Sequence, residues 1–426
     1  MSDLLLFLRI CVACLCCAAV SAGAFAEEAT LNGVSFTLPD SGWEREEGEG
    51  SIILRRTWER DEAAGRDETG GALIQILPIT NMGDFDTSFD QLFGMFPELA
   101  EDDPLTDSQG RTVNGHDIRV ELRCCTIVEG ASVSATLAGI AEGGFGQYIM
   151  LIEMNLHDED SDAAEAAFAQ IVRSVRFSPD EKEAFALTPP EGAGGLEGVY
   201  TTLTTTLMPN VFGGLDFVAE NEVLALDPDG FFSTVIPAGT VAEHCADAPT
   251  DCGTYKLTGG GLFSSERTIE MSQMINDYGV IEVSQEPFQE AKKQLVIGET
   301  TYNRVPPLPQ GTTFEGTWRY FWASSGTTAT STGGVSSERM LTLTSNGRFT
   351  QTGSSGYMSS FDGADTTTGV AGTNTAPLES GTYSVEGYRL VLTGEDGRTQ
   401  TLSLFLPEPG SDELLVIDGN SYLKED

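Results

Sequence analysis

Basic side chains and histidine are scarce in this chain. Lysine and arginine together number 23 against 65 acidic residues, for a formal net charge of −42, and there are three histidines. A surface this acidic repels the phosphates of DNA and RNA and the headgroups of anionic lipids. The composition therefore argues against nucleic acid and an anionic membrane surface as partners. It favours a protein partner with a basic surface.

Long apolar runs are lacking after the first 26 residues. Residues 4–20 are almost wholly apolar apart from Arg9, and Ala24-Phe25-Ala26 matches the A-x-A pattern of a signal-peptide cleavage site. The apolar run is short for a bilayer span of about 20 residues. We therefore expect residues 1–26 to be a signal peptide, and the protein to be exported to the periplasm or secreted. Lipoprotein processing at Cys14, which would tether the protein to a membrane, is an alternative.

The common catalytic signatures are also missing. The sequence holds no G-x-S-x-G, H-E-x-x-H, Walker A or dinucleotide-binding glycine pattern, and His116, His157 and His244 fall in different stretches. The acids of 158–162 alternate as in a calcium loop, but Ala163 replaces the required glycine, so we interpret them as the start of a helix. We expect no catalytic residue, no bound metal and no cofactor. A hydrolase that uses a pair of carboxylates stays open, since 65 acids allow many pairs.

Few cysteines remain outside the expected signal peptide, which contains four of the eight. Cys245 and Cys252 flank a short turn and predict a disulfide in an oxidising compartment. A metal site that adds His244 is the alternative. Cys124 and Cys125 are adjacent on an expected strand, so their side chains should point to opposite faces, with one of them buried. A vicinal disulfide is the alternative for that pair.

Residues 27–178 combine strand-like and helix-like patterns. Apolar residues at helical spacing predict a helix over 85–99, and Asp162 followed by Glu165 predicts the capped start of a second helix. The strand-like segments are 33–38, 51–58, 72–79, 116–128, 131–141 and 146–155.

Three pieces of this region carry a resemblance to a known fold. They are Phe36-Thr37-Leu38-Pro39 followed by Trp43, the apolar strand 148–152, and the end of the second helix at 171–177. In this order they resemble the fold shared by PsbP, Mog1 and DcrB proteins, an antiparallel sheet flanked by helices. The resemblance implies assembly or adaptor work on other proteins rather than chemistry.

The remainder of the chain repeats itself after a Pro/Gly-rich linker at 179–195, in which a short helix is expected at 180–186. A second, proline-rich linker at 306–313 separates the two copies. Four motifs recur in one order: 196–200 and 314–318, 226–232 and 343–349, 252–257 and 380–385, and 295–302 and 415–422. Each copy exceeds the 20–50 residues of a solenoid repeat. We therefore expect two duplicated domains, 196–305 and 314–426.

Each copy offers about eight short strands with no helical pattern between them, which favours an up-and-down barrel without exposed sheet edges. Gly316-Thr317-Trp318 is similar to the G-x-W of lipocalin-like (calycin) barrels, in which the tryptophan closes the barrel base, and Tyr200 takes that place in the first copy. The expected fold class is mainly β with one α+β domain. An N-terminal antiparallel sheet flanked by helices precedes two tandem up-and-down β-barrels of about eight strands each.

The second copy contains two stretches rich in serine, threonine and glycine, 324–337 and 353–376, which we interpret as loops at the barrel mouth. Tyr357 and Phe361 are the large aromatics there, and so the first candidates for ligand contact. Our leading hypothesis is an exported, acidic, non-catalytic binding or adaptor protein. The alternatives are a carrier that encloses a small apolar ligand in a barrel, and the carboxylate-pair hydrolase.

Overall fold

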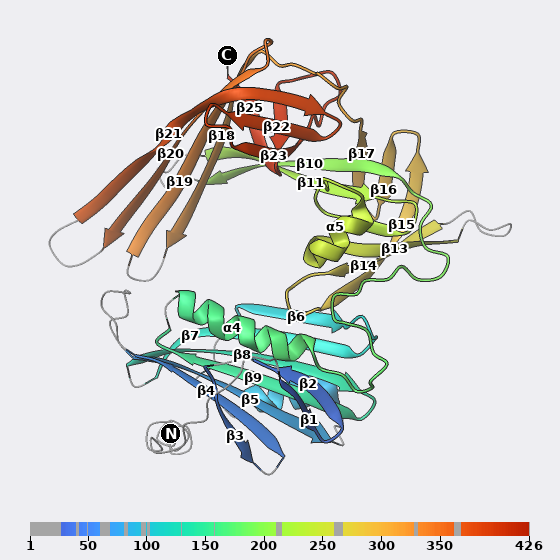
Figure 1. Ribbon diagram of the computed structural model, residues 1–426, viewed down its shortest axis with the longest axis vertical. Coiled ribbons are helices and arrows are strands. Elements are labelled where there is room, and N and C mark those ends of the chain that lie inside the picture. Colours follow the sequence, from blue (N-terminus) through green and yellow to red (C-terminus); the bar gives the residue numbers. More distant parts are fainter. Residues whose placement is uncertain are drawn as a thin grey trace. The chain divides into compact units, whose positions relative to one another are not determined.

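The computed structural model describes most of the chain between residues 27 and 425 (Figure 1). The described residues are 27–39, 42–48, 50–59, 69–80, 84–94, 99, 103–128, 130–156, 158–209, 215–259, 267–327, 331–361 and 368–425. The expected signal peptide and His157 lie outside them. Among the helices of these residues, none is long and apolar enough to cross a membrane. The chain divides into two compact units, Met1–Leu187 with Ser272–Val283, and Thr188–Met271 with Ser284–Asp426.

An antiparallel sheet with the strand order β6-β7-β8-β9-β5-β4-β3 forms the first unit, together with a separate β1–β2 hairpin and helices α2 and α4. The strands are β1 (Glu27–Leu31), β2 (Val34–Leu38), β3 (Glu44–Gly48), β4 (Ser51–Trp58), β5 (Gly70–Thr80), β6 (Thr106–Arg111), β7 (Asp117–Val128), β8 (Ala131–Glu142) and β9 (Phe145–Met154). The helices are α2 (Phe85–Phe93) and α4 (Asp158–Arg173). Strand β6 also pairs with β15 (Ile281–Ala291), through the single residue pair Arg111 and Ile281.

Both faces of this sheet are covered by apolar side chains. Ile149 and Leu151 of β9 join the core cluster that contains Phe168 of α4, whereas the alternate residue Tyr148 joins the cluster that contains Phe89 of α2. A strand with two buried faces needs apolar residues at every position. This explains why residues 148–152 of β9 form a continuous apolar run in the sequence.

The helices of the first unit differ in their bounds from the expectation. The second helix, α4, begins at Asp158, so Asp162 lies inside it and does not cap it. The acids of 158–162 occupy the first turns, where they complement the positive end of the helix. Helix α2 ends at Phe93 rather than at 99, and its N-cap Asp84 accepts a hydrogen bond from the Thr87 amide at 3.0 Å. Residues 180–186 form turns and irregular chain, not the expected helix.

Two closed, eight-stranded antiparallel barrels follow, so the expected fold class is confirmed. Barrel one runs β10 to β17 in chain order and is completed by the pairing of β14 with β15, and barrel two runs β18 to β25 (Figure 1). Barrel one contains β10 (Gly198–Pro209), β11 (Leu215–Leu226), β12 (Phe231–Ser233), β13 (Cys252–Gly259), β14 (Arg267–Met274), β15 (Ile281–Ala291), β16 (Gln294–Ile297) and β17 (Thr300–Val305). Barrel two contains β18 (Gly316–Thr327), β19 (Ser331–Leu343), β20 (Arg348–Phe361), β21 (Thr368–Glu386), β22 (Arg389–Gly394), β23 (Thr399–Phe405), β24 (Leu414–Ile417) and β25 (Asn420–Lys424).

Barrel one is not free of helix, contrary to the expectation. Helix α5 (Val241–Asp247) and the 3-10 turn η2 (Pro249–Asp251) connect β12 to β13. The helix begins with a reciprocal capping box: the Thr240 hydroxyl accepts from the Glu243 amide, and the Glu243 carboxylate accepts from the Thr240 amide. A helix of seven residues is marginal on its own, and a capping box stabilises it by satisfying two backbone amides at its start.

A buried tyrosine fastens the entry of barrel one to a turn. The Tyr255 hydroxyl accepts a hydrogen bond from the Leu196 amide at 2.8 Å and donates to the Asp227 carbonyl oxygen at 2.7 Å. The Tyr255 amide donates to the carbonyl oxygen of Gly230, whose φ of +97° completes the turn between β11 and β12. One side chain therefore satisfies backbone groups of two distant segments.

Barrel two repeats this arrangement with different residues. The Tyr383 hydroxyl accepts from the Phe314 amide at 2.8 Å and donates to the Thr344 carbonyl oxygen at 3.0 Å. Its amide donates to the carbonyl oxygen of Gly347, in the turn between β19 and β20. Tyr383 and its three partners occupy the positions that the sequence repeat aligns with Tyr255 and its partners. The duplication is thus visible in side-chain hydrogen bonding as well as in strand order.

Candidate functional site

The two residues expected at the barrel bases are buried on the first strand of each barrel. Trp318 is 0 % exposed, donates its indole N–H to the Asp412 carbonyl oxygen at 2.7 Å, and has the Lys424 ammonium 5.1 Å from its ring centroid. Tyr200 is 6 % exposed, and the Arg304 guanidinium lies 5.9 Å from its ring. Burial raises the pKa of the Tyr200 phenol. Both aromatics thus carry a cation over one face, the arrangement of a cation–π contact.

The barrels place alternate apolar residues in shared cores. In barrel one the cluster consists of Leu196, Tyr200, Leu224, Leu226, Phe232, Tyr255, Ile269, Phe288, Leu295 and Ile297. In barrel two it consists of Phe314, Trp318, Leu341, Leu343, Phe349, Tyr383, Val385, Leu390, Leu392, Leu404, Leu415, Ile417 and Tyr422. These side chains pack on one another within the described part of each barrel. The backbones of Tyr357 and Phe361, the expected ligand contacts, lie in β20, but their side chains lie outside the described residues.

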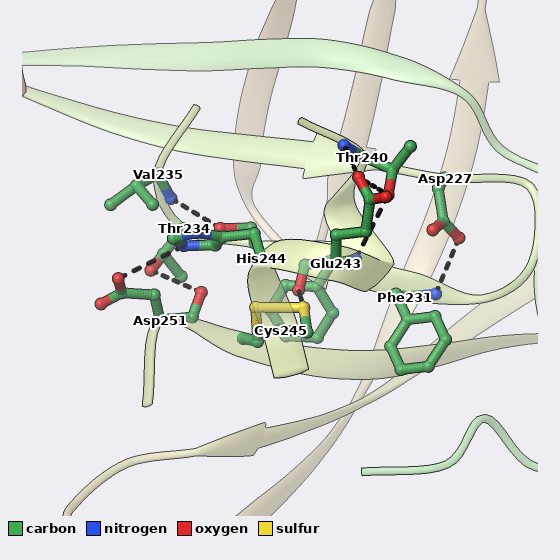
Figure 2. The surroundings of a disulfide bond; sticks show 12 residues. Asp227, Phe231, Thr234, Val235, Thr240, Glu243, His244, Cys245 and Asp251 are labelled. Atoms are coloured by element: carbon green, nitrogen blue, oxygen red, sulfur yellow. Dashed lines mark hydrogen bonds and ion pairs between the residues drawn. A yellow bond between two sulfur atoms is a disulfide. The ribbon is translucent and has the colours of Figure 1, made fainter. Parts of the chain in front are cut away.

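Cys245 and Cys252 form a disulfide that joins α5 to the start of β13, as Figure 2 shows. Their Cα atoms are 5.4 Å apart, and both residues are buried. His244 lies beside the disulfide, with Nε2 at 3.4 Å from the Asp251 carboxylate. Because the two sulfurs are bonded to each other, they are not thiolate ligands, and this arrangement favours the disulfide interpretation over the metal site with His244.

Cys124 and Cys125 also form a disulfide, so the expectation of side chains on opposite faces, one of them buried, is wrong. The pairing of β7 with β8 shifts register between Cys124 and Thr126, which interrupts the regular alternation of a strand. Cys124 is half-buried and Cys125 is exposed.

A network of ion pairs surrounds Arg119 near the start of β7. Its guanidinium lies 2.8 Å from the carboxylate of Glu121, which is 1 % exposed, 3.0 Å from Asp107 and 2.9 Å from Asp90. Burial alone would lower the pKa of Arg119, but these carboxylates together raise it. Arg123 also pairs with Glu121. The network satisfies a buried carboxylate, which is a structural role.

A second buried carboxylate, Glu153 of β9, lies against α4. It accepts hydrogen bonds from the hydroxyls of Ser134 at 3.1 Å and Ser161 at 2.8 Å, and it is 5 % exposed. Burial raises its pKa, and the two serine hydrogen bonds offset part of that rise. The Tyr278 ring of the β14–β15 hairpin packs on Phe168 of the same helix.

One group of side chains among the described residues has donor atoms placed as metal ligands would be: His116, Glu142 and Glu181, here called the histidine cluster. The ligand atoms of the three residues all lie within 4.8 Å of one another. His116 Nε2 is 3.0 Å from Glu181 Oε1, and the side chains of these two are 10 % and 12 % exposed. Glu142 is exposed.

Three segments of the first unit supply the histidine cluster. His116 precedes β7, Glu142 ends β8, and Glu181 belongs to the segment that follows α4. This segment is held to the turn before β7, because the Asn114 side chain exchanges hydrogen bonds with the backbone of Lys182 at 2.9 and 3.1 Å. Since the three residues are far apart in the sequence, no local motif could reveal the cluster.

The chain has a weak likeness to a solved structure, whereas the sequence comparisons find no match. No family model and no curated protein matches the chain. The Ran-binding protein Mog1p of Saccharomyces cerevisiae is a weak structural neighbour, with a TM-score of 0.25 and 13 % identity over 36 % of this chain and 96 % of that one. The lipocalin-like resemblance of the barrels stays a prediction.

Proposed function

We propose that the protein is an exported, non-catalytic binding or adaptor protein that recognises a partner with a basic surface. The observation that carries this proposal is the packing of both barrels. Their described interiors hold clusters of buried aromatic and aliphatic side chains, which leaves recognition to the outer surface. With a net charge of −42, that surface attracts cationic partners and repels anionic ones.

The edge strand β3 illustrates the character of this surface. All five of its residues are exposed, and three of them are glutamates. Arg45 pairs with Glu27 and Glu47, but this leaves a net negative edge. Charged side chains on an edge strand discourage pairing with other strands, so contact there would be electrostatic rather than by strand addition.

Capture at two salt concentrations tests this proposal. The purified protein is immobilised and exposed to an extract of the cells that produce it, at low and at high ionic strength, and cross-linked peptides then locate the contact. We expect a partner of basic surface that is retained at low salt and released at high salt, because the attraction is screened. Capture that does not depend on salt, or the absence of specific capture, would contradict the proposal.

The carrier of a small apolar ligand is the alternative, and native mass spectrometry separates the two. A bound mass that survives in the intact protein and is lost on denaturation would favour the carrier. A mass equal to that of the polypeptide favours the adaptor. Turnover in a broad panel of glycoside and ester substrates would instead support the carboxylate-pair hydrolase.

A further inference from the structure

We infer that the histidine cluster is a binding site for one divalent transition-metal ion, best suited to Zn²⁺. His116, Glu142 and Glu181 offer one imidazole nitrogen and two carboxylate oxygens that converge on one point. This site lies in the first unit and is independent of the adaptor function proposed above.

The distance between the two buried donors suits a shared ion. Two ligand atoms about 2.1 Å from a tetrahedral zinc ion lie about 3.4 Å apart. His116 Nε2 and Glu181 Oε1 are 3.0 Å apart. If the two atoms move apart by a few tenths of an ångström, the ion fits between them in place of the hydrogen-bonding proton. Glu142, the third donor, is exposed and free to turn toward the ion by rotation about its side-chain bonds.

Hydrogen bonds hold the two buried donors in place. The Thr112 amide donates to the His116 carbonyl oxygen at 2.9 Å, and the His116 amide donates to the Thr112 hydroxyl at 3.2 Å. Glu181 accepts from the Phe177 amide at 3.2 Å through Oε2, which leaves Oε1 directed at His116. The Phe177 ring packs edge-on against the imidazole, with 4.9 Å between centroids. A site organised before the ion arrives loses less entropy on binding.

The donor set selects among metals. Imidazole with carboxylates suits Zn²⁺, whereas Ca²⁺ and Mg²⁺ take oxygen ligands almost exclusively. Two carboxylates and a neutral imidazole also balance the two charges of the ion. Three protein ligands leave one tetrahedral position for water. The ion would tie Glu181, and the segment that follows α4, to the β8 end at Glu142.

Calorimetric titration of the EDTA-treated protein with Zn²⁺ tests the site. Millimolar Mg²⁺ is kept in the buffer, because a chain of charge −42 attracts cations diffusely. We expect one saturable site per chain, and at least about tenfold weaker binding for each of His116→Ala, Glu142→Gln and Glu181→Gln. His244→Ala is the matched control, because its imidazole also faces a carboxylate, at 3.4 Å, but is not part of the cluster.

Glu142→Gln keeps the experiment decisive if the buried variants fold poorly, because that side chain is exposed. The visible spectrum of the Co²⁺-loaded protein adds a second readout. The wild type should show the intense bands of a tetrahedral nitrogen–oxygen site, and Glu142→Gln should weaken them. Absence of a saturable site, unchanged binding in His116→Ala, or an equal loss in His244→Ala would overturn the proposal and leave an ordinary histidine–glutamate pair.

Discussion

Barrel one and barrel two share a frame, meaning their strand order and one set of tyrosine hydrogen bonds, but they differ in one connection. In both, a tyrosine of the fourth strand fastens the segment before the first strand to the turn between the second and third strands. The third and fourth strands are joined by α5 and a disulfide in barrel one. In barrel two these strands are instead lengthened, to Arg348–Phe361 and Thr368–Glu386. The two barrels thus share their strand order and their tyrosine hydrogen bonds, and they differ in the connection between the third and fourth strands.

The largest effect is expected from the aromatic that each barrel places on its first strand. Trp318→Ala should destabilise barrel two by about 3–5 kcal/mol, because a fully buried indole is replaced by a cavity. Tyr200→Ala should do the same to barrel one with a similar magnitude. Hydrogen exchange in rising urea, read by mass spectrometry, reports each barrel separately. If Trp318→Ala lowered the protection of barrel one as strongly as that of barrel two, the two frames would not be independent.

The disulfide should matter to one barrel alone. Replacing Cys245 and Cys252 together by alanine removes a cross-link that constrains the unfolded chain, and should cost barrel one about 2–4 kcal/mol. Barrel two has no disulfide among its described residues, so its exchange should stay unchanged. The same exchange experiment, performed on the oxidised wild type and on the double variant, measures the difference. Cys124→Ala with Cys125→Ala is the control for loss of the other disulfide.

The two tyrosine hydroxyls should contribute equally. Tyr255→Phe and Tyr383→Phe each remove a buried hydroxyl that bridges backbone groups, at an expected loss of about 1–3 kcal/mol in the barrel that carries the change. Urea midpoints of the two variants, followed by exchange in each barrel, give the comparison. A loss in one barrel and none in the other would mean that the shared frame is stabilised differently in the two copies.

The duplicated barrels could be predicted from the sequence because the turns and motifs that define them are local. The hairpin turn after Ile417 contains Gly419 with a φ of +76°, and the turn at Gly394–Gly397 is closed by a hydrogen bond from the Gly397 amide to the Gly394 carbonyl oxygen at 3.0 Å. The bounds of α4 were less predictable, since Asp158 and Asp162 are equally acceptable near a helix start.

Two further features that the sequence did not predict depend on contacts between residues far apart in the chain. The register shift beside Cys124 arises from the pairing of β7 with β8, which the pattern of one strand does not encode. The histidine cluster needs the segment after α4 to fold back onto the turn before His116. A pattern of residues along the chain contains neither kind of information.

The smallest effect is a pH dependence in the first unit, which neither barrel should share. Burial raises the Glu153 pKa above its ordinary value of 4.5, so the native state holds this proton more tightly than the unfolded chain does. The protonated Glu153 therefore makes its full contribution to the free energy of unfolding below pH 4.5, and this contribution is lost as the pH rises through the higher pKa of the native state. Glu153→Gln cannot ionise, so it should exceed the wild type in stability at neutral pH and match it in acid. Urea unfolding from pH 4 to 8 measures this, with the exposed Glu197→Gln as control. A stability difference that does not change with pH would show that the variant acts through its hydrogen bonds to Ser134 and Ser161, not through charge.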